Sequence, residues 1–433
     1  MSSKLNSDMN NNYKHIIRLM FTAVLMWSSC SIQAEKPADE TESSMSPSVR
    51  DWFKNGELPG NLQFQGFASQ AFISTSDNDV FGNTDENGGS FGFTEVGLNA
   101  LMRPMPRLQL SAQVLTRRAG NGSSATPRLD FGFADYRLYS HETNQFGFRI
   151  GRLKNPFGFY NDTRDVAFTR PSIILPQSIY FDRTRNLVLS SDAVHFYADS
   201  SHTDFGSIAI QFGLIRPIVD DKDTKTIIGV NQPGDLTSSL SYIGRGVYET
   251  NDKRIRLAVS GSRTNVGYDP ALGDKLKAGT IQFSPIIFSA EYNTEKWSLT
   301  SEYALRHFRI RNFGAPFPLN DSNFTGESYY FQGVYRFNTK WEGLLRYDVL
   351  YTDKSDRSGK AFARKSGGVV PAHSRFAKDI TVGLRWNVTP SFMLRAEYHR
   401  VNGTAWLSRL DNPGSSATSQ HWNLFAVQAS FRF

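Results

Sequence analysis

Histidine is the side chain best suited to acid–base chemistry near neutral pH, and seven histidines follow residue 34. They are scattered along the chain: His141, His195, His202, His307, His373, His399 and His421. His399 lies two residues after Glu397, which places both on one face of a strand. No HExxH motif, nucleophile elbow, phosphate-binding loop or metal-spaced Cys/His set occurs. The sequence therefore predicts no catalytic residue, metal or cofactor, and a hydrolase built on His399 is the alternative.

Charged side chains at alternate positions form a second group that could do chemistry. Read by strand parity, they would share the polar face of a sheet: Arg149, Arg254, Arg256, Arg306, Arg346, Arg385, Arg395, Glu302, Glu342 and Asp348, with Arg336, Arg432, Glu291, Asp379 and Glu397. More charges lie in one irregular stretch: Lys154, Asp162, Arg164, Asp165, Arg170, Asp182, Arg183 and Arg185. Such residues are suited to line the wall of a water-filled channel, and an excess of arginine at close quarters favours anions.

The composition of the 433 residues excludes several classes of protein. Mean hydropathy is −0.40, and no stretch after the N-terminal region approaches the ~18 apolar residues that a membrane helix needs. Aromatic residues make up 13% of the chain, far too many for a disordered protein. The net charge of +7 is dispersed, which argues against a nucleic-acid partner.

The N-terminal segment predicts export. Lys14 and Arg18 precede a short apolar core over 19–27, and a small-residue exit ends at Ala34. We therefore expect a signal peptide over residues 1–34, and a periplasmic lead-in over residues 35–61. Cys30 is the single cysteine of the chain, so the mature protein would have no disulfide.

From residue 62 to residue 433 the chain repeats one unit, in which about ten residues alternate apolar with polar. Seven tight turns are expected near residues 104–106, 140–144, 200–204, 251–253, 294–296, 338–340 and 389–391. Between them lie eight longer loops, near residues 74–90, 117–127, 153–192, 216–236, 265–275, 310–326, 353–377 and 403–420. Fifteen connections join sixteen strands, and the alternation of short turns with long loops is typical of outer-membrane barrels.

Closure of this sheet follows from its two faces. The apolar face needs a non-aqueous partner, and strands of about this length cross the hydrocarbon layer at a tilt. A soluble sandwich is the alternative, but it would have shorter strands and no systematic alternation of loops. In lipid an open sheet edge leaves backbone groups unsatisfied, so we expect a closed, all-β, 16-stranded antiparallel transmembrane barrel. Pro285 is the one proline expected within a strand, at a bulge.

The third long loop, about 153–192, is rich in apolar residues and proline. A loop so apolar needs a surface to pack on, and we expect it to fold inward as a constriction of the channel. Its charges would then face the arginines of the wall. The alternative is that the apolar part is a trimer contact or reaches over a neighbouring copy.

These features resemble the Gram-negative outer-membrane porins. The last run, with Phe431 and Phe433, looks like the signature read by the barrel-assembly machinery. The segment 151–158, with Arg164-Asp165 and residues 168–172, is similar to a region of the phosphate-selective porin O/P family. That resemblance implies an outer-membrane location and a homotrimer. It also implies anion binding by lumen arginines and lysines.

The sequence thus predicts an outer-membrane porin for passive diffusion of small hydrophilic solutes and ions, with a mild preference for anions. A dedicated anion or phosphate site, an outer-membrane enzyme and an adhesin remain as alternatives. The expected partners are membrane lipid, small hydrophilic or anionic solutes and the assembly machinery.

Overall fold

The computed structural model describes residues 62–433, with gaps at residues 86–87, 203–204, 230–231, 315–316 and 318. The predicted signal peptide and lead-in, residues 1–34 and 35–61, lie outside the described residues. The part described is one sheet of eighteen strands with short helices in its connections.

Sixteen of the strands are long enough to cross a bilayer. They are β1 (Leu62–Thr75), β2 (Ser90–Met105), β3 (Leu108–Ala119), β5 (Arg128–His141), β6 (Asn144–Lys154), β7 (Ser190–His202), β8 (Gly206–Pro217), β10 (Ser241–Glu249), β11 (Ile255–Asp269), β12 (Gly279–Asn293), β13 (Trp297–Arg311), β14 (Asn323–Arg336), β15 (Trp341–Tyr351), β16 (Phe376–Thr389), β17 (Phe392–Gly403) and β18 (His421–Arg432). The two short strands, β4 (Ser123–Ser124) and β9 (Asp235–Ser238), extend β3 and β11 locally.

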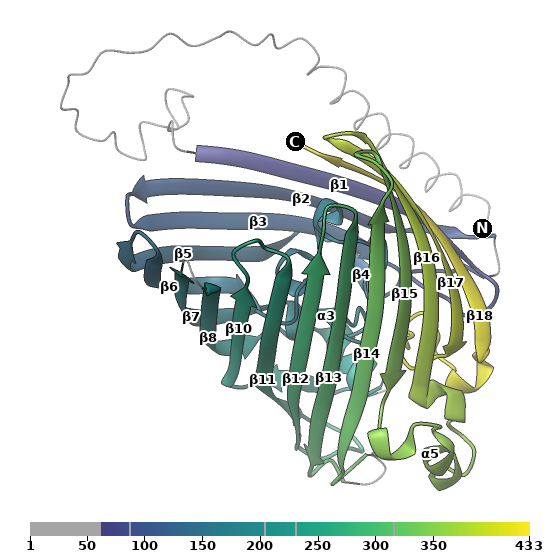
Figure 1. Ribbon diagram of the computed structural model, residues 1–433. Coiled ribbons are helices and arrows are strands. Elements are labelled where there is room, and N and C mark those ends of the chain that lie inside the picture. The colour runs from purple at the N-terminus through teal and green to yellow at the C-terminus, as the bar shows by residue number, and fades with distance from the viewer. Residues whose placement is uncertain (1–61, 86–87, 203–204, 230–231, 315–316, 318) are drawn as a thin grey trace, which may run out of the picture. The chain divides into compact units, whose positions relative to one another are not determined.

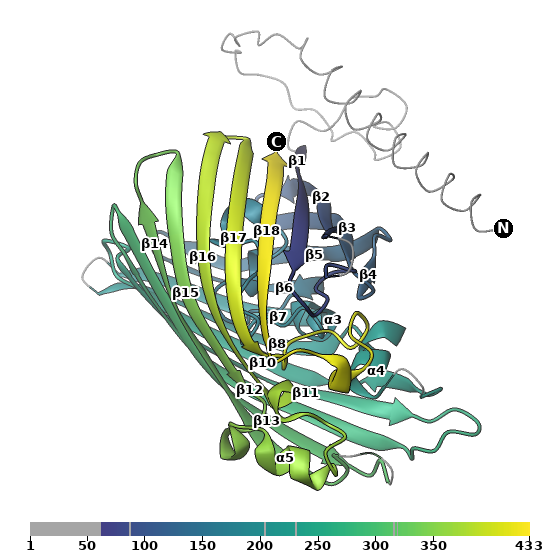
Figure 2. The ribbon, with the colours of Figure 1, turned by 90° about the vertical axis from the view of Figure 1, so that its right-hand side faces the viewer.

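The sheet closes on itself. Each long strand pairs antiparallel with its neighbours in the chain, and β1 pairs with both β2 and β18 (Figure 1). The turned view shows β18 lying beside β1 at this closure (Figure 2). The predicted 16-stranded antiparallel barrel is therefore confirmed.

The two faces of the barrel differ as the period of two requires. Large apolar side chains point outward and are exposed, among them Leu98, Ile210, Leu257 and Val382. Aromatic pairs gather where strands meet the short turns, and the stacked rings of Trp341 and Trp386 lie 5.2 Å apart. An apolar belt with aromatic residues at its edge is what the bilayer selects on a barrel's outer surface.

Short turns lie at one end of the barrel and long loops at the other, as predicted. The loops carry the described helices: η1 (Asn161–Thr163), η2 (Ala167–Thr169), α3 (Arg185–Leu189), α4 (Asp221–Ile227), η3 (Lys354–Asp356), α5 (Lys360–Lys365), η4 (Ala372–Arg375) and η5 (Ser415–Ala417). None of the described helices is long and apolar enough to cross a membrane.

The prolines correct one detail of the sequence reading. Pro285 lies inside β12, but the ladder there keeps its register and omits two pairs rather than forming a bulge. Pro104 also lies within a strand, β2, where the register does shift between Met102 and Met105. Proline has no backbone N–H to donate to the ladder. The sheet accommodates this by a gap in the ladder at Pro285 and by a bulge at Pro104.

The C-terminus completes the barrel at the short-turn end. The backbone N–H of Phe433 donates to the carbonyl of Gly66 at 3.0 Å, and the return bond is 3.1 Å. The ring of Phe433 packs over Gly66, and a Cβ at residue 66 would have to displace it. Phe431 and Phe433 both keep exposed rings on the outer face.

Candidate functional site

The third long loop, residues 155–189, folds into the barrel, as predicted. Ile173, Ile174 and Phe181 of this constriction loop are buried against the inner wall near Phe93 and Leu350. A second apolar cluster holds Phe157, Leu175, Ile179 and Tyr180 with the inner residues of β8, β10 and β12–β14. The apolar part of the loop therefore packs on its own barrel.

Glu302 on β13 is the first polar clamp on this loop. Its carboxylate accepts the backbone N–H of Phe159 at 3.0 Å and the hydroxyl of Tyr180 at 2.6 Å. Two wall residues, Ser289 and Tyr330, donate to it as well, at 2.6 and 2.9 Å. Because Glu302 is completely buried, four donors around one carboxylate are needed to offset its lost hydration.

A second clamp lies on β15 and β17. Arg395 donates to the carbonyls of Ala167, Arg170 and Ser172, and Arg346 donates to the hydroxyl of Ser172 and the carbonyl of Ile174. Glu397 accepts the N–H of Ile173 at 2.5 Å and that of Ile174 at 3.3 Å. These wall charges serve as hydrogen-bond partners for loop backbone groups that would otherwise be buried unpaired.

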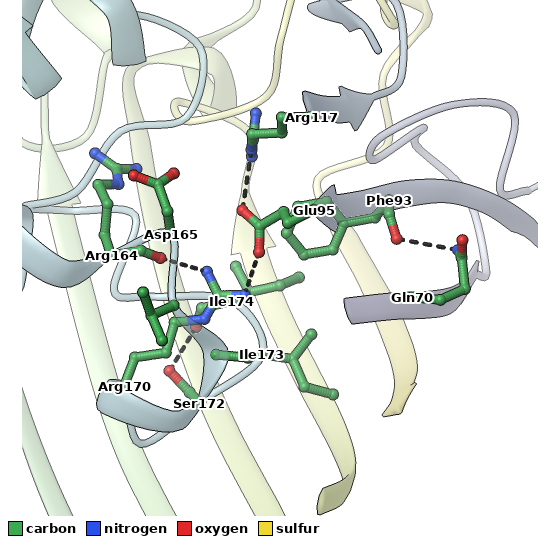
Figure 3. Close-up of polar contacts among 12 residues, drawn as sticks. Gln70, Phe93, Glu95, Arg117, Arg164, Asp165, Arg170, Ser172, Ile173 and Ile174 are labelled. Carbon is green, nitrogen blue, oxygen red and sulfur yellow. Dashed lines mark hydrogen bonds and ion pairs between the residues drawn. The ribbon is translucent and has the colours of Figure 1, made fainter. Parts of the chain in front are cut away.

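A third clamp joins the loop to β2 and β3 (Figure 3). Glu95 lies between Arg117 and Arg170, with N–O distances of 3.2 and 2.7 Å. Arg117 also pairs with Asp182 at 2.8 Å, and Arg164 lies 3.4 Å from the same carboxylate. Glu95 is fully buried and both its partners are nearly so, and removing Glu95 would leave the buried Arg170 without its carboxylate partner.

The ends of the loop are fixed in the same way. Lys154 pairs with Asp130 at 2.5 Å and with Asp165 at 2.6 Å, and Asp165 also contacts Arg185. Asp162 pairs with Arg245 on β10 at 2.6 Å. The predicted loop charges thus bind the wall and one another.

The structure divides the predicted site residues into two groups by exposure. Arg164, Arg170, Arg185, Arg346, Arg395, Glu302 and Asp348 are buried inside the barrel by the loop contacts. Arg149 and the pair Arg385–Glu342 keep part of their side chains exposed on the wall, and Arg256 lies over the ring of Phe159. Arg254 falls in the turn before β11, 63% exposed beside Asp252, rather than on the barrel wall. That these residues line the ion path stays a prediction.

Sequence reasoning missed four residues that complete the clamps: Glu95, Arg117, Asp130 and Arg245. Each is a charged residue at an inward position of its strand, either in the middle or in the half nearer the long loops. The signal was present in the alternation. What the sequence lacked was the partner across the barrel, since the contacts between Glu95 and Arg170 span 75 residues.

Two cavities flank the constriction loop. The turn-side chamber, about 340 Å³, is lined by polar side chains such as Gln65, Asn99 and Arg149 together with apolar ones such as Phe131 and Leu153. The outer vestibule, about 420 Å³, opens toward the long loops and is lined by β11–β14, the loop segment 179–188 and the loops before β16 and β18. In the vestibule, burial and the neighbouring charges of Arg409 and Arg375 lower the pKa of Arg183 to about 10.

His399 is a member of the second clamp. Its Nδ1 lies 2.9 Å from Asp379 and 3.1 Å from the hydroxyl of Thr381, and its Nε2 lies 3.4 Å from Glu397. The ring is buried, and Glu397 is already engaged by loop backbone. Among the described residues no group of three or more His, Cys, Asp or Glu side chains is arranged to hold a metal ion.

Comparisons with known proteins give the fold. No family model and no curated protein matches the chain. The chain is similar to the solved outer-membrane channel DcaP of Acinetobacter baumannii, with 12% identity and a TM-score of 0.51 over 86% of this chain and 97% of DcaP. It is also similar to an anion-selective porin from Comamonas acidovorans, with 13% identity and a TM-score of 0.50 over 86% of this chain and 98% of that porin. OprB of Pseudomonas putida (9%, 0.54) covers 89% of this chain and has 96% of its own covered. The chain thus has the fold of Gram-negative outer-membrane porins.

Proposed function

We propose that this protein is an outer-membrane porin that forms a water-filled channel for passive diffusion of small hydrophilic solutes and ions, with a mild preference for anions. The observation that carries the proposal is a closed 16-stranded barrel whose inner loop is clamped to the wall beside a polar chamber. A barrel of sixteen strands encloses an aqueous space rather than a packed core.

The anion preference rests on arginines that border the two cavities and take no part in the three clamps. Arg149 in the turn-side chamber, and Arg183 and Arg306 in the vestibule, border the two cavities on either side of the loop. Guanidinium groups in a narrow aqueous space raise the local concentration of anions. The remaining loop charges determine the width of the channel, because they hold the loop in position.

A dedicated phosphate site in the segment that resembles the porin O/P family is the less favoured reading. In this chain Lys154 is paired with Asp130 and Asp165, and Arg170 is paired with Glu95. A phosphate would have to displace buried carboxylates to reach these cations, at a large cost in free energy. We therefore propose general anion preference in place of phosphate selectivity.

We further propose that the channel acts without catalysis and as a homotrimer in outer-membrane lipid. The buried position of His399 and the use of Glu397 as a loop clamp support the first statement. For the second, the fold neighbour OmpT of Vibrio cholerae has been solved in a trimer form. Phe431 and Phe433, exposed at the end of β18, suit recognition by the barrel-assembly machinery.

Single-channel recording in planar bilayers tests this function. The purified protein should conduct in potassium chloride, and its reversal potential in a salt gradient should favour chloride, with no block by added phosphate. Deletion within residues 160–185 should increase the conductance several-fold, because the loop fills the bore. A matched deletion within the outer loop 270–278 should leave it unchanged. A protein that inserts as a folded barrel and passes no current would overturn the proposal.

A further inference from the structure

The upper part of the β12–β14 wall reverses the usual polarity of a porin strand. On β12 the inward positions include Ile281, Phe283 and Ile287, whereas the outward positions Gln282 and Ser284 are polar. On β13, Phe308 and Ile310 face inward while His307, Arg309 and Arg311 face outward. The outward polar residues indicate that these strand ends stand in water beyond the lipid. Their inner face is nevertheless apolar, which a wall for water alone does not require.

Three phenyl rings form a row across this inner face. Phe283 on β12 is the register partner of Phe308 on β13, and Phe308 is the partner of Phe324 on β14. The ring centroids lie 4.8 Å apart for the first pair and 5.0 Å for the second. All three rings are only partly buried and line the outer vestibule. Leaving them against water costs free energy that an apolar ligand would recover.

Arginines border the same cavity. Arg306 lies on the same face of β13 as Phe308, two residues away, and Arg183, Arg375 and Arg409 reach the cavity from the loops. The guanidinium groups of Arg183 and Arg306 lie 5.6 and 4.9 Å from the centroid of one ring, that of Phe181. Among the described residues that line the vestibule there is no Asp or Glu.

These cations lack carboxylate partners. Within the described residues, none of Arg183, Arg306, Arg375 and Arg409 takes part in an ion pair, whereas the clamp arginines Arg117, Arg164, Arg170 and Arg185 all do. Arg306 is 4% exposed, and its guanidinium donates to the carbonyl of Tyr351 at 2.9 Å but meets no carboxylate in the described part of the chain. A buried guanidinium without an anion is an unfavourable arrangement that a bound anion would relieve.

We propose that the outer vestibule is a binding site for amphipathic organic anions, in which the aromatic row holds an apolar body while Arg183 and Arg306 bind its carboxylate or sulfonate. The cavity, about 420 Å³, is within the range of pockets that hold small ligands. Such a site would concentrate these anions above the constriction loop. It deepens the proposed porin function, because it names a class of solute that the channel captures.

Equilibrium binding to the full protein in lipid nanodiscs tests the site, with naphthoate as the probe. Naphthoate should bind at least tenfold more tightly than inorganic phosphate, which has no apolar body, and than naphthylmethanol, which has no charge. Equal binding of naphthoate and phosphate, or of naphthoate and naphthylmethanol, would overturn the proposal.

Variants locate the site. Phe308→Ser and Arg183→Gln should each weaken naphthoate binding about tenfold, while Arg309→Gln, on the outward face of the same strand, should leave it unchanged. Arg183 also donates to the carbonyl of Ala405 at 2.6 Å, so Arg375→Gln provides a second test that leaves this contact intact, with a loss of about threefold. Naphthoate binding that survives both Phe308→Ser and Arg375→Gln in folded protein would refute the site.

Measuring chloride conductance in the absence of naphthoate distinguishes the porin proposal from the binding-site proposal. A protein that conducts chloride but does not bind naphthoate fails as an amphipathic-anion binder and remains a porin. A protein that binds naphthoate through these residues but passes no current keeps the site and fails as a porin.

Discussion

The two cavities on either side of the constriction loop are lined by the same kind of alternating strands, but they differ in how their arginines are paired. The turn-side chamber has amide and charged side chains among its lining residues, and its wall arginine, Arg149, pairs with Asp135 at 2.8 Å. The outer vestibule is apolar, and its arginines have no carboxylate partner among the described residues. The difference teaches that the polarity of a barrel's inner face depends on depth. The alternation along a strand determines which residues point inward. Whether those inward residues are polar or apolar depends on their height in the barrel.

The loop that separates the chambers depends on buried clamps, so loosening one should have the largest effect. Glu302→Gln would leave the N–H of Phe159 and the hydroxyl of Tyr180 with a weaker acceptor in a fully buried position. We expect a stability loss of about 3 kcal/mol, as for buried hydrogen bonds to a charged group, and a several-fold rise in single-channel conductance as the loop detaches. Conductance and thermal unfolding of the purified barrel measure the two effects.

Glu342→Gln is the matched control for this variant. Glu342 also lies on the inner wall, but it is partly exposed and its oxygen is 3.8 Å from Arg385. Its replacement should leave conductance and unfolding nearly unchanged, because an exposed ion pair contributes little. If the two variants behaved alike, the loop would not be held by Glu302.

A smaller effect is expected in the turn-side chamber. Arg149→Gln removes a charge that is one-third exposed, and water and salt screen it. The ratio of chloride to potassium permeability should fall by about twofold, which the reversal potential in a salt gradient reports. Arg254→Gln, in the exposed turn before β11, should not change the ratio. An unchanged ratio in Arg149→Gln would mean that ions do not pass this chamber.

Much of the fold could be predicted from the sequence, because its causes are local. Alternation with a period of two, turn residues and loop lengths gave the sixteen strands and their order. Inward parity also found most of the wall charges, including Glu302, Arg346 and Arg395. The roles of these charges could not be predicted, since Arg395 binds carbonyls more than 200 residues away in the chain. A mid-strand charge looks the same in the sequence whether it faces water or clamps a loop.

The vestibule escaped sequence reasoning for a related reason. The sequence pattern assigns no role to Phe283 or Phe308, and Phe324 falls within the predicted long loop near residues 310–326. Only the register of β12, β13 and β14 shows that these rings share an inner row. A shift from apolar-out to polar-out along one strand marks the level where the strand leaves the membrane, and it is visible in retrospect as Gln282 and Ser284.

The smallest effect concerns the loops that cover the outer end. Asp411, in the loop before β18, accepts the backbone N–H of Asn121 at 2.8 Å, and burial, with the charge of Asp79, raises its pKa to about 6. A carboxyl whose pKa is raised on folding stabilises the loop contact at low pH, and this contribution is lost as the pH rises through about 6. We therefore expect the loop over residues 404–420 to be cut faster by added protease at pH 7.5 than at pH 5.

Limited proteolysis of proteoliposomes measures this, with a protease equally active at both values. Asp411→Asn should remove most of the pH dependence by keeping the group neutral, whereas Asp321→Asn, an exposed acid in another loop, should not. Since Asn412 also bonds the backbone of Asp79 at 2.8 and 3.0 Å, part of the contact persists at any pH. Equal cleavage of the wild-type loop at both pH values would show that Asp411 titrates without loosening its loop. The outer cover of the vestibule would then be as fixed as the clamps beneath it.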